Sequence, residues 1–227
     1  MAMPYSSATL TQVVQFGLIN AYLVREDDGL TLIDALNPKG EQRILAAAEA
    51  LGAPITRIAL THAHPDHVGS LDALARLLPD AELIVGRRES KPLAGDRSPQ
   101  AGEPEGKKPP KLKVQAQPSR LVDAGDLIGS LQVVAAPGHS QGQIAFLDTR
   151  DQTLICGDAY STIGGVATTA GPYWRFPLPG FVSWHRPTAL QTARDLRALN
   201  PSRLAPGHGK VVENPGAAMD RAIARSA

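Results

Sequence analysis

Four potential metal ligands stand within six residues of this chain, directly after an apolar run, Ile55 to Leu60, that predicts a buried strand. The ligand-bearing segment reads Thr61-His62-Ala63-His64-Pro65-Asp66-His67. Imidazole and carboxylate groups suit zinc, iron or manganese. Such side chains need partners when they are packed between a core strand and a helix, because unpaired burial is costly. The segment therefore predicts a metal site at the end of a core strand.

The remaining chain alternates strand and helix signals. Strands are expected at Leu10 to Phe16, Ile19 to Val24, Leu30 to Ile33, Ile55 to Leu60, Glu82 to Val85, Leu131 to Ala135, Gln143 to Leu147, Thr153 to Cys156 and Arg203 to Ala205. Helices are expected at Lys39 to Leu51, Val68 to Leu78, Arg186 to Leu199 and Asn214 to Ala227. This alternation predicts a layered fold of the α/β or α+β class.

Length and composition limit the kind of protein. A chain of 227 residues that is 43% apolar can bury a full core as one domain, 1–227. Its net charge of +1 gives no argument for nucleic acid or an anionic membrane. The one cysteine, Cys156, excludes an intrachain disulfide framework and is expected to be a buried core residue. With no apolar run of membrane-spanning length and no secretory signal at the start, the expected location is the cytoplasm.

Two stretches break the regular pattern. Residues 86–120 contain six of the nineteen prolines and nine Lys or Arg, which predicts a long basic insertion. It is interpreted as a solvated loop or an oligomer contact, with contact to a phosphate-bearing substrate as the alternative. The second stretch, Tyr160 to Trp184 within about 159–186, holds six of the ten aromatic residues among prolines and glycines. It predicts a long loop whose rings either pack beneath it or wall a substrate pocket.

The pattern His62-x-His64-x-Asp66-His67 resembles the signature of the metallo-β-lactamase superfamily, a group of mostly dinuclear metallohydrolases. Three later motifs resemble further motifs of that family, in the family's order. They are Pro137-Gly138-His139-Ser140, Cys156-Gly157-Asp158-Ala159 and Pro206-Gly207-His208-Gly209. The resemblance covers the chain from Asp34 to His208 and implies a single-domain αββα sandwich. The sixth histidine, His185, matches no ligand motif and is placed outside the site.

The resemblance also implies a ligand set for two metal ions. One ion would be held by His62, His64 and His139, and the other by Asp66, His67 and His208, with Asp158 bridging them. Five histidines and two aspartates exceed the needs of one tetrahedral zinc. Two zinc ions are therefore expected, with iron or manganese as alternatives. Asp34 is expected either to cap its turn or to brace the segment Thr61 to His67, here called the histidine loop, by a hydrogen bond to one of the metal ligands.

The expected reaction is hydrolysis of a small ester, lactone or thioester. A hydroxide bridging the two metal ions would attack the substrate carbonyl, and Asp66 would help to move the proton to the leaving group. Tyr160 stands near the position where lactonases of the superfamily place a tyrosine that supports the substrate carbonyl, so it is a second catalytic candidate. The expected partner is a small molecule. If the rings of the loop at about 159–186, here called the aromatic loop, wall the substrate pocket, they would favour a substrate with an apolar acyl portion.

Other members of the superfamily fit the sequence less well. True β-lactamases usually carry serine or cysteine in place of Asp158, and glyoxalase II enzymes add a C-terminal helical region. Two alternatives stay open: a mononuclear iron oxygenase resembling the persulfide dioxygenases, and a phosphodiesterase or RNA-processing nuclease.

Overall fold

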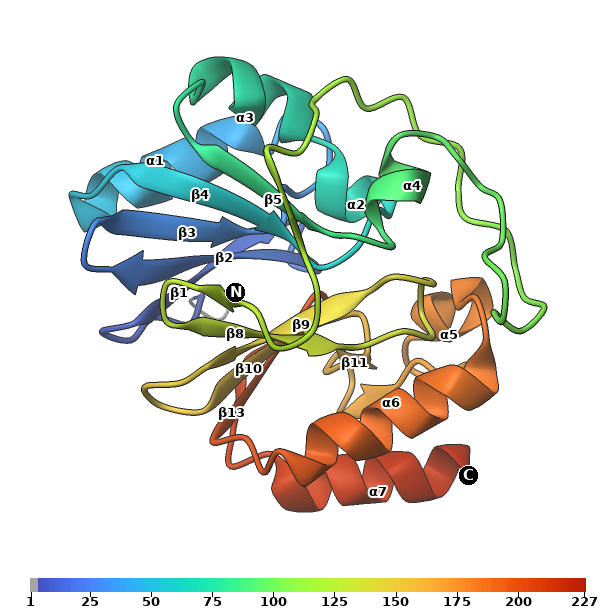
Figure 1. Cartoon of the computed structure of the whole chain (residues 1–227). Coiled ribbons are helices and arrows are strands. Elements are labelled where there is room, and N and C mark those ends of the chain that lie inside the picture. Colours follow the sequence, from blue (N-terminus) through green and yellow to red (C-terminus); the bar gives the residue numbers. More distant parts are fainter. Residues whose placement is uncertain (1–3) are drawn as a thin grey trace.

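A computed structural model describes residues 4–227, which form two six-stranded sheets packed face to face (Figure 1). In the first sheet the strands lie in chain order: β1 (Leu10–Gln15), β2 (Ile19–Glu26), β3 (Gly29–Ile33), β4 (Ile55–Leu60), β5 (Glu82–Gly86) and β6 (Arg120–Val122). The second sheet has the order β14 (Val212–Glu213), β13 (Arg203–Pro206), β10 (Thr153–Gly157), β9 (Ile144–Asp148), β8 (Leu131–Ala135) and β7 (Leu127–Ile128). A short hairpin pairs β11 (Tyr160–Ser161) with β12 (Ala167–Thr168).

Helices cover the outer face of each sheet (Figure 1). Helices α1 (Glu41–Leu51) and α3 (Leu71–Leu77) lie on the first sheet, whereas α6 (Arg186–Ala198) and α7 (Gly216–Ser226) lie on the second. Three shorter helices, α2 (Pro65–Val68), α4 (Ser90–Leu93) and α5 (Leu178–Val182), lie at one edge of the sandwich. The expected αββα sandwich is thus confirmed. None of the helices in residues 4–227 is both long and apolar enough to cross a bilayer.

The layers follow from the two-residue alternation of side chains along the strands. In β4, Ile58 and Leu60 point toward the helices α1 and α3, while Ala59 points toward the second sheet. In β9, Phe146 lies between the sheets, while Leu147 packs toward α6 and α7. Each sheet is therefore buried on both faces, and most buried apolar residues belong to one of three apolar layers.

One expected helix is divided into two. The segment from Val68 to Leu78 was expected to be continuous, but α2 ends at Val68 and α3 begins at Leu71. Between them, Gly69 donates its N–H to the Leu36 carbonyl, and a Cβ on this glycine would lie 2.5 Å from the Pro38 nitrogen. The turn after β3, at Leu36 to Pro38, therefore packs directly against Gly69. This close contact interrupts the helical hydrogen bonds between α2 and α3.

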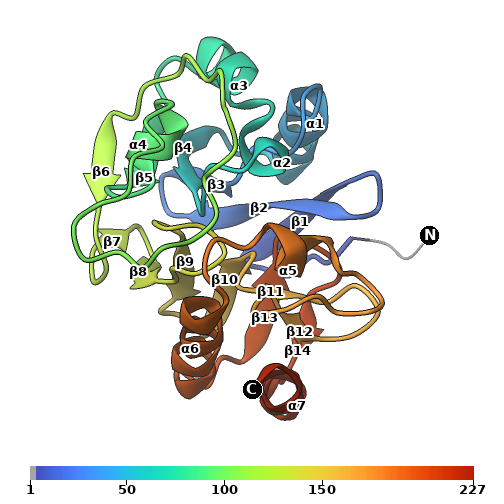
Figure 2. The ribbon, with the colours of Figure 1, turned by 90° about the vertical axis from the view of Figure 1, so that its right-hand side faces the viewer.

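Both irregular stretches contain more structure than expected. The insertion 86–120 begins with α4, and its remainder, here called the strap (residues 94–119), runs irregularly from α4 to β6. Figure 2 shows the strap descending toward α5 before it returns to β6. The backbone N–H of Lys107 donates to the Trp184 carbonyl at 3.0 Å, so the two irregular stretches meet. The aromatic loop is not wholly irregular either, because it contains β11, β12 and α5.

Candidate metal centre

The predicted ligands all follow the ends of strands. Strands β3, β4 and β5 are parallel, so their carboxyl ends lie at one edge of the first sheet. The histidine loop follows β4 at this edge, and α2 presents Asp66 and His67 in its single turn. In the second sheet, His139 follows β8, while Asp158 and His208 follow the parallel strands β10 and β13. Packing the two sheets brings all seven residues to one place.

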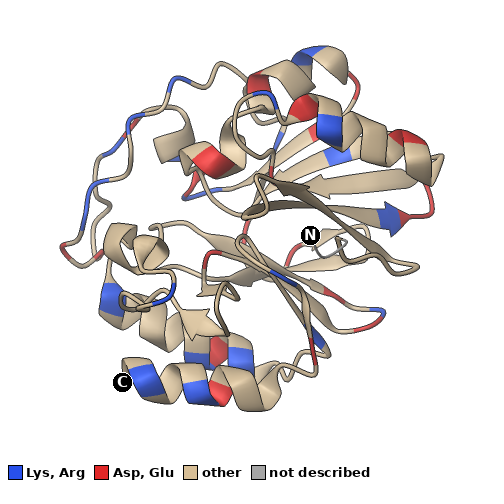
Figure 3. Cartoon of the chain, turned by 180° about the vertical axis from the view of Figure 1, so that it is seen from behind, with Lys and Arg blue, Asp and Glu red and all other residues tan. Residues whose placement is uncertain are grey.

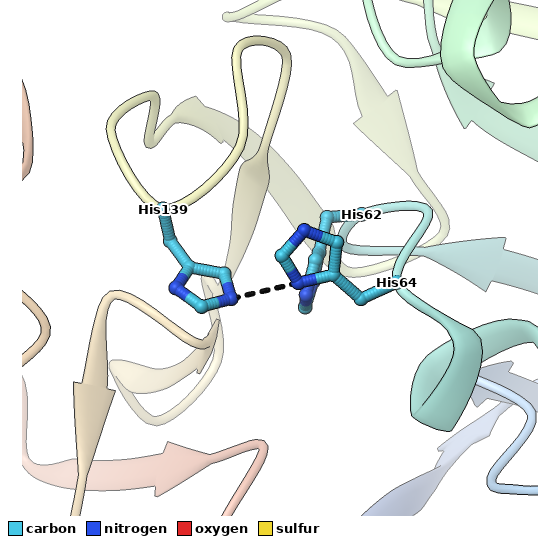
Figure 4. A group of neighbouring side chains, drawn as sticks. All are labelled: His62, His64 and His139. Carbon is cyan, nitrogen blue, oxygen red and sulfur yellow. Dashed lines mark hydrogen bonds between the residues drawn. The ribbon is translucent and has the colours of Figure 1, made fainter. Parts of the chain in front are cut away.

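The first group of ligands consists of His62, His64 and His139 (Figure 4). One nitrogen from each ring lies within 4.8 Å of the others. The Nδ1 atom of His64 lies 2.9 Å from the Nε2 atom of His139, although the two residues are on different sheets. Burial, followed by the neighbouring imidazoles, lowers the pKa of His64 to about 3. Burial likewise lowers the pKa of His139 to about 4, so both rings are neutral at pH 7 and can offer lone pairs.

The second group consists of Asp66, His67 and His208. The Oδ2 atom of Asp66 lies 3.3 Å from the Nε2 atom of His208 and 3.9 Å from that of His67. Burial disfavours a charged imidazole at His208, but the Asp158 carboxylate outweighs it and raises the pKa of His208 to about 10. A cation entering this group would displace that proton, as metal ions do when they bind histidine.

Asp158 lies between the two groups. Its Oδ2 atom is 3.4 Å from His139 Nε2 and 3.1 Å from His208 Nε2, and its Oδ1 atom is 3.4 Å from His67 Nε2. The carboxylate is buried, and one of its oxygens thus contacts a ring from each group. This is the position that a carboxylate shared by two cations requires.

Unpaired buried atoms show that the site fits metal ions. Within residues 4–227, the Nε2 atoms of His62 and His67 and the Oδ1 atom of Asp158 are buried without any hydrogen-bond partner. Buried polar atoms are nearly always paired, because an unpaired one costs on the order of 1 to 3 kcal/mol. All three atoms face the same cluster, and all are ligand types that zinc and iron accept. Two cations would satisfy them.

Four of the five imidazoles are fixed from behind through Nδ1. The acceptors are the Thr61 hydroxyl for His62 (3.0 Å), the Asp34 carboxylate for His67 (2.7 Å), the Ser183 hydroxyl for His139 (3.0 Å) and the Leu18 carbonyl for His208 (3.1 Å). The proton on Nδ1 leaves the lone pair of Nε2 pointing into the cluster. Asp34 also accepts from the Thr61 N–H and hydroxyl, so it braces the histidine loop as the resemblance implies.

Ser183 was not found from the sequence. Its hydroxyl is buried and donates to the carbonyl of Thr169 or Pro179, at 2.8 and 2.9 Å, which leaves its oxygen to accept from His139. A serine in a loop rich in prolines and aromatics carries no signal of this role. The contact depends on where the aromatic loop returns to the second sheet.

The structure does not support a catalytic role for Tyr160. Its side chain is fully buried in the apolar layer between the second sheet and α6 and α7. Its hydroxyl donates to the Ala193 carbonyl of α6 at 2.6 Å, and it does not line the cavity beside the metal ligands. The interpretation as a substrate-binding hydroxyl was wrong because Tyr160 belongs to β11, whose side chain at this position points toward the helices.

The other two residues singled out behave as expected. Cys156 is buried in the same apolar layer, and burial raises the pKa of its thiol. His185 caps α6, with its Nδ1 atom 2.7 Å from the Thr188 hydroxyl.

A cavity of about 510 Å³ opens beside the cluster. Its floor is formed by metal-ligand candidates, including Asp66 and His208. Residues of the aromatic loop form one wall, namely Phe176, Leu178, Pro179, Phe181, Val182 and Trp184. Lys107 to Pro110 of the strap form part of the remaining lining. Trp174, by contrast, is 77% exposed and lies outside the cavity, so only some of the predicted aromatic rings wall it.

Comparison with known proteins supports the resemblance to the metallo-β-lactamase superfamily. The sequence model of the metallo-beta-lactamase superfamily matches residues 14–208. An uncharacterized protein of Bacillus subtilis (strain 168), YobT, is 42% identical over 212 residues, which are 92% of this chain and 90% of YobT. A hydroxyacylglutathione hydrolase of Acidiphilium cryptum (strain JF-5) is 27% identical over 165 residues, which are 72% of this chain. The chain spans 58% of the length of that hydrolase and 47% of a similar hydrolase from Aeromonas hydrophila.

Solved structures show the same fold. A metallo-beta-lactamase from Pontibacter korlensis superposes with a TM-score of 0.67 at 16% identity, covering 97% of this chain and 95% of its own. The di-iron-bound form of TTHA1623 superposes with a TM-score of 0.61 at 26% identity, covering 95% of this chain and 96% of its own. The match to the family sequence and the shared fold agree with the clustered histidines and aspartates. The chain therefore belongs to the metallo-beta-lactamase superfamily of metal-dependent hydrolases.

Proposed function

We propose that this protein hydrolyses a small ester, lactone or thioester with the help of two metal ions, and that these ions are zinc. One observation carries the proposal: two groups of ligands meet at Asp158 and open into a single cavity. Two ions sharing a carboxylate are a common arrangement in hydrolases, in which they acidify a water molecule and polarise the substrate carbonyl. Iron is a specific alternative, because the similar protein TTHA1623 has a di-iron-bound form.

Asp66 is suited to move a proton during this reaction. Both Asp66 and Asp158 line the cavity, but the Asp66 side chain is 31% exposed whereas that of Asp158 is buried. Burial would raise its pKa, but the neighbouring His67 and His208 outweigh this and lower the pKa of Asp66 to about 2. The carboxylate is therefore ionised at neutral pH, and it can take up a proton at the floor of the cavity and give it to the leaving group.

The cavity wall favours a substrate with an apolar portion. Phe181 is 50% exposed, and Leu178 and Val182 beside it are also exposed, so a ligand can cover apolar surface there. Figure 3 shows Lys and Arg along the strap, and Lys107 and Lys108 belong to the cavity lining. An acyl compound with an apolar chain and an anionic end would find partners on both sides.

The test combines metal analysis with a panel of substrates. Protein reconstituted with zinc, iron or manganese would be analysed for metal content and assayed with lactones, thioesters, esters and phosphodiesters. We expect about two ions per chain and hydrolysis of a carboxylic ester, lactone or thioester that stops on chelation. One iron per chain together with oxygen consumption on a persulfide would overturn the proposal in favour of a mononuclear oxygenase. Turnover of phosphodiesters alone would instead indicate a nuclease.

A further inference from the structure

A buried carboxylate outside the predicted ligand set joins two of the ligand-bearing loops. Glu89 is the last residue of the turn after β5 and immediately precedes α4, and it is only 2% exposed. Its Oε1 atom accepts from the N–H of Ala63 at 2.8 Å. Its Oε2 atom accepts from the Ser140 hydroxyl and from the Gly142 N–H, both at 2.9 Å. All three partners are donors, as an ionised carboxylate requires.

The positions of these donors connect Glu89 to the metal centre. Ala63 stands between His62 and His64, and Ser140 is adjacent to His139. One oxygen of Glu89 therefore holds the loop after β4 in the first sheet, and the other holds the loop after β8 in the second. The three histidines of the first ligand group are all in these two loops. Their spacing depends on how the two sheets meet at this point.

The local packing is built around this carboxylate. A Cβ at Gly142 would lie 2.5 Å from the Glu89 nitrogen and 2.8 Å from the Arg88 carbonyl carbon, so only glycine allows the approach. Burial raises the pKa of Glu89, while the hydrogen bonds from Ala63, Ser140 and Gly142 act in the opposite direction. An apolar side chain would leave these donors without acceptors inside the protein. Burial of this carboxylate costs desolvation free energy, which a role in simple packing does not explain.

We propose that Glu89 is a positioning residue that sets the separation of His62 and His64 from His139, and thereby the affinity of the first metal ion. Residues that orient metal ligands from behind commonly change metal affinity by about 10- to 100-fold when they are lost. Glu89 accepts hydrogen bonds from two ligand loops, one on each sheet, whereas Asp34 contacts the loop after β4 and Ser183 contacts the His139 ring. The sequence indicates this role only by position: Glu89 follows the parallel strand β5, as Asp34 follows β3 and the histidine loop follows β4.

The matched control is Glu26, a largely buried carboxylate that also joins the two sheets. It accepts from the N–H and hydroxyl of Ser130, at 3.2 and 2.9 Å. Because Glu26 ends β2, which runs antiparallel to β3, it lies at the edge of the sandwich opposite the metal centre. Glu26→Gln therefore reproduces the loss of a cross-sheet carboxylate without disturbing the ligand loops.

The experiment measures metal binding rather than turnover, so it remains informative even if the proposed hydrolase activity is wrong. Glu89→Gln, Glu26→Gln and the wild-type chain would be titrated with Zn²⁺ and Co²⁺ against a chelator, and the visible spectrum of the Co²⁺ form would be recorded. In Glu89→Gln an amide NH₂ must face at least one donor. We expect one of the two ions to bind 10- to 100-fold more weakly and the Co²⁺ bands to shift, with Glu26→Gln unchanged in both. Wild-type affinity and spectrum in Glu89→Gln, or equal losses in both variants, would overturn the proposal.

A second variant keeps the test decisive if Glu89→Gln does not fold. Ser140→Ala removes one of the three donors and leaves the carboxylate in place. We expect it to weaken metal binding by about 2- to 10-fold, a smaller effect than that of Glu89→Gln. If both variants fold, their effects should be non-additive, because both act through one hydrogen bond. Unchanged metal affinity in Ser140→Ala, or additive losses, would contradict a clamp formed by Glu89.

Discussion

The metal centre and the cavity wall are adjacent but are built in different ways. In the centre, the rings of His62, His67 and His139 are buried, and each has a hydrogen-bond partner at Nδ1 that fixes its orientation. In the wall, Phe181 and Leu178 are at least half exposed, and they belong to a short helix in an irregular loop. If the proposed function is correct, the fold would fix the metal ligands tightly, whereas substrate choice would depend on a few surface side chains.

The largest effect is expected at Asp158, where both ligand groups meet. Asp158→Ala would leave two cations without their shared anion, so we expect turnover to fall by roughly 10²-fold or more and metal content to drop. Turnover and elemental analysis on the folded protein check this. The control is Asp195→Ala, which removes an exposed aspartate of α6 whose carboxylate accepts from the Gln191 amide. A variant that keeps two ions and near-full turnover would show that Asp158 does not bridge.

Ser183 tests whether the two regions are separate, because it belongs to the aromatic loop but supports a ligand. Ser183→Ala removes the acceptor for the His139 Nδ1–H, so we expect metal affinity to fall by about 10-fold. Chelator competition measures this. Ser202→Ala is the control, since that hydroxyl donates to the Asp151 carbonyl far from the cluster. If only substrate affinity changed, Ser183 would belong to the wall alone.

The wall itself is tested by Phe181→Ala. Loss of a half-exposed ring would remove about 1 kcal/mol of apolar contact, so KM for a long acyl substrate should rise roughly fivefold. A short acyl substrate and the metal content should be nearly unaffected. Trp174→Ala serves as the matched control, because that ring lies outside the cavity. Equal losses on long and short substrates would contradict a role in acyl recognition.

The smallest effect on activity is expected at Tyr160. Tyr160→Phe removes the hydrogen bond to the Ala193 carbonyl in the core, so the free energy of unfolding should fall by about 1 kcal/mol. Turnover of the folded enzyme should be unchanged. Denaturant unfolding and steady-state kinetics check the two expectations. A large fall in kcat with unchanged stability would return Tyr160 to the list of catalytic candidates.

The sequence predicted most of the sandwich, because its core strands are long and apolar. β4 lies at Ile55–Leu60 and β8 at Leu131–Ala135, as expected. The very short strands were missed: β7 and β14 have two residues each, too few for any periodicity to show. The division between α2 and α3 could not be read either, because it depends on contact between Gly69 and the turn after β3.

The site was predictable to the extent that its residues form local motifs. The seven ligand candidates stand in four short motifs, and the structure brings all of them together. Glu89 and Ser183 belong to no such motif, because the partners of Glu89 are 26, 51 and 53 residues away in the chain and His139 is 44 residues away from Ser183. Tyr160 shows the opposite failure, since proximity to Asp158 in sequence did not place its hydroxyl in the cavity. Contacts between distant segments decided each of these cases.

The division of the ligands between the two sheets has a consequence for the lifetime of the protein. His67 comes from the first half of the chain and His208 from the second, so a cation bound by both closes a loop of about 140 residues. In the chain-entropy treatment of covalent cross-links, a loop of ~100 residues corresponds to about 4 to 5 kcal/mol. Metal binding of this kind acts as a reversible fastening between the halves. We therefore expect the metal-free chain to be cleaved by proteases faster than the metal-bound chain.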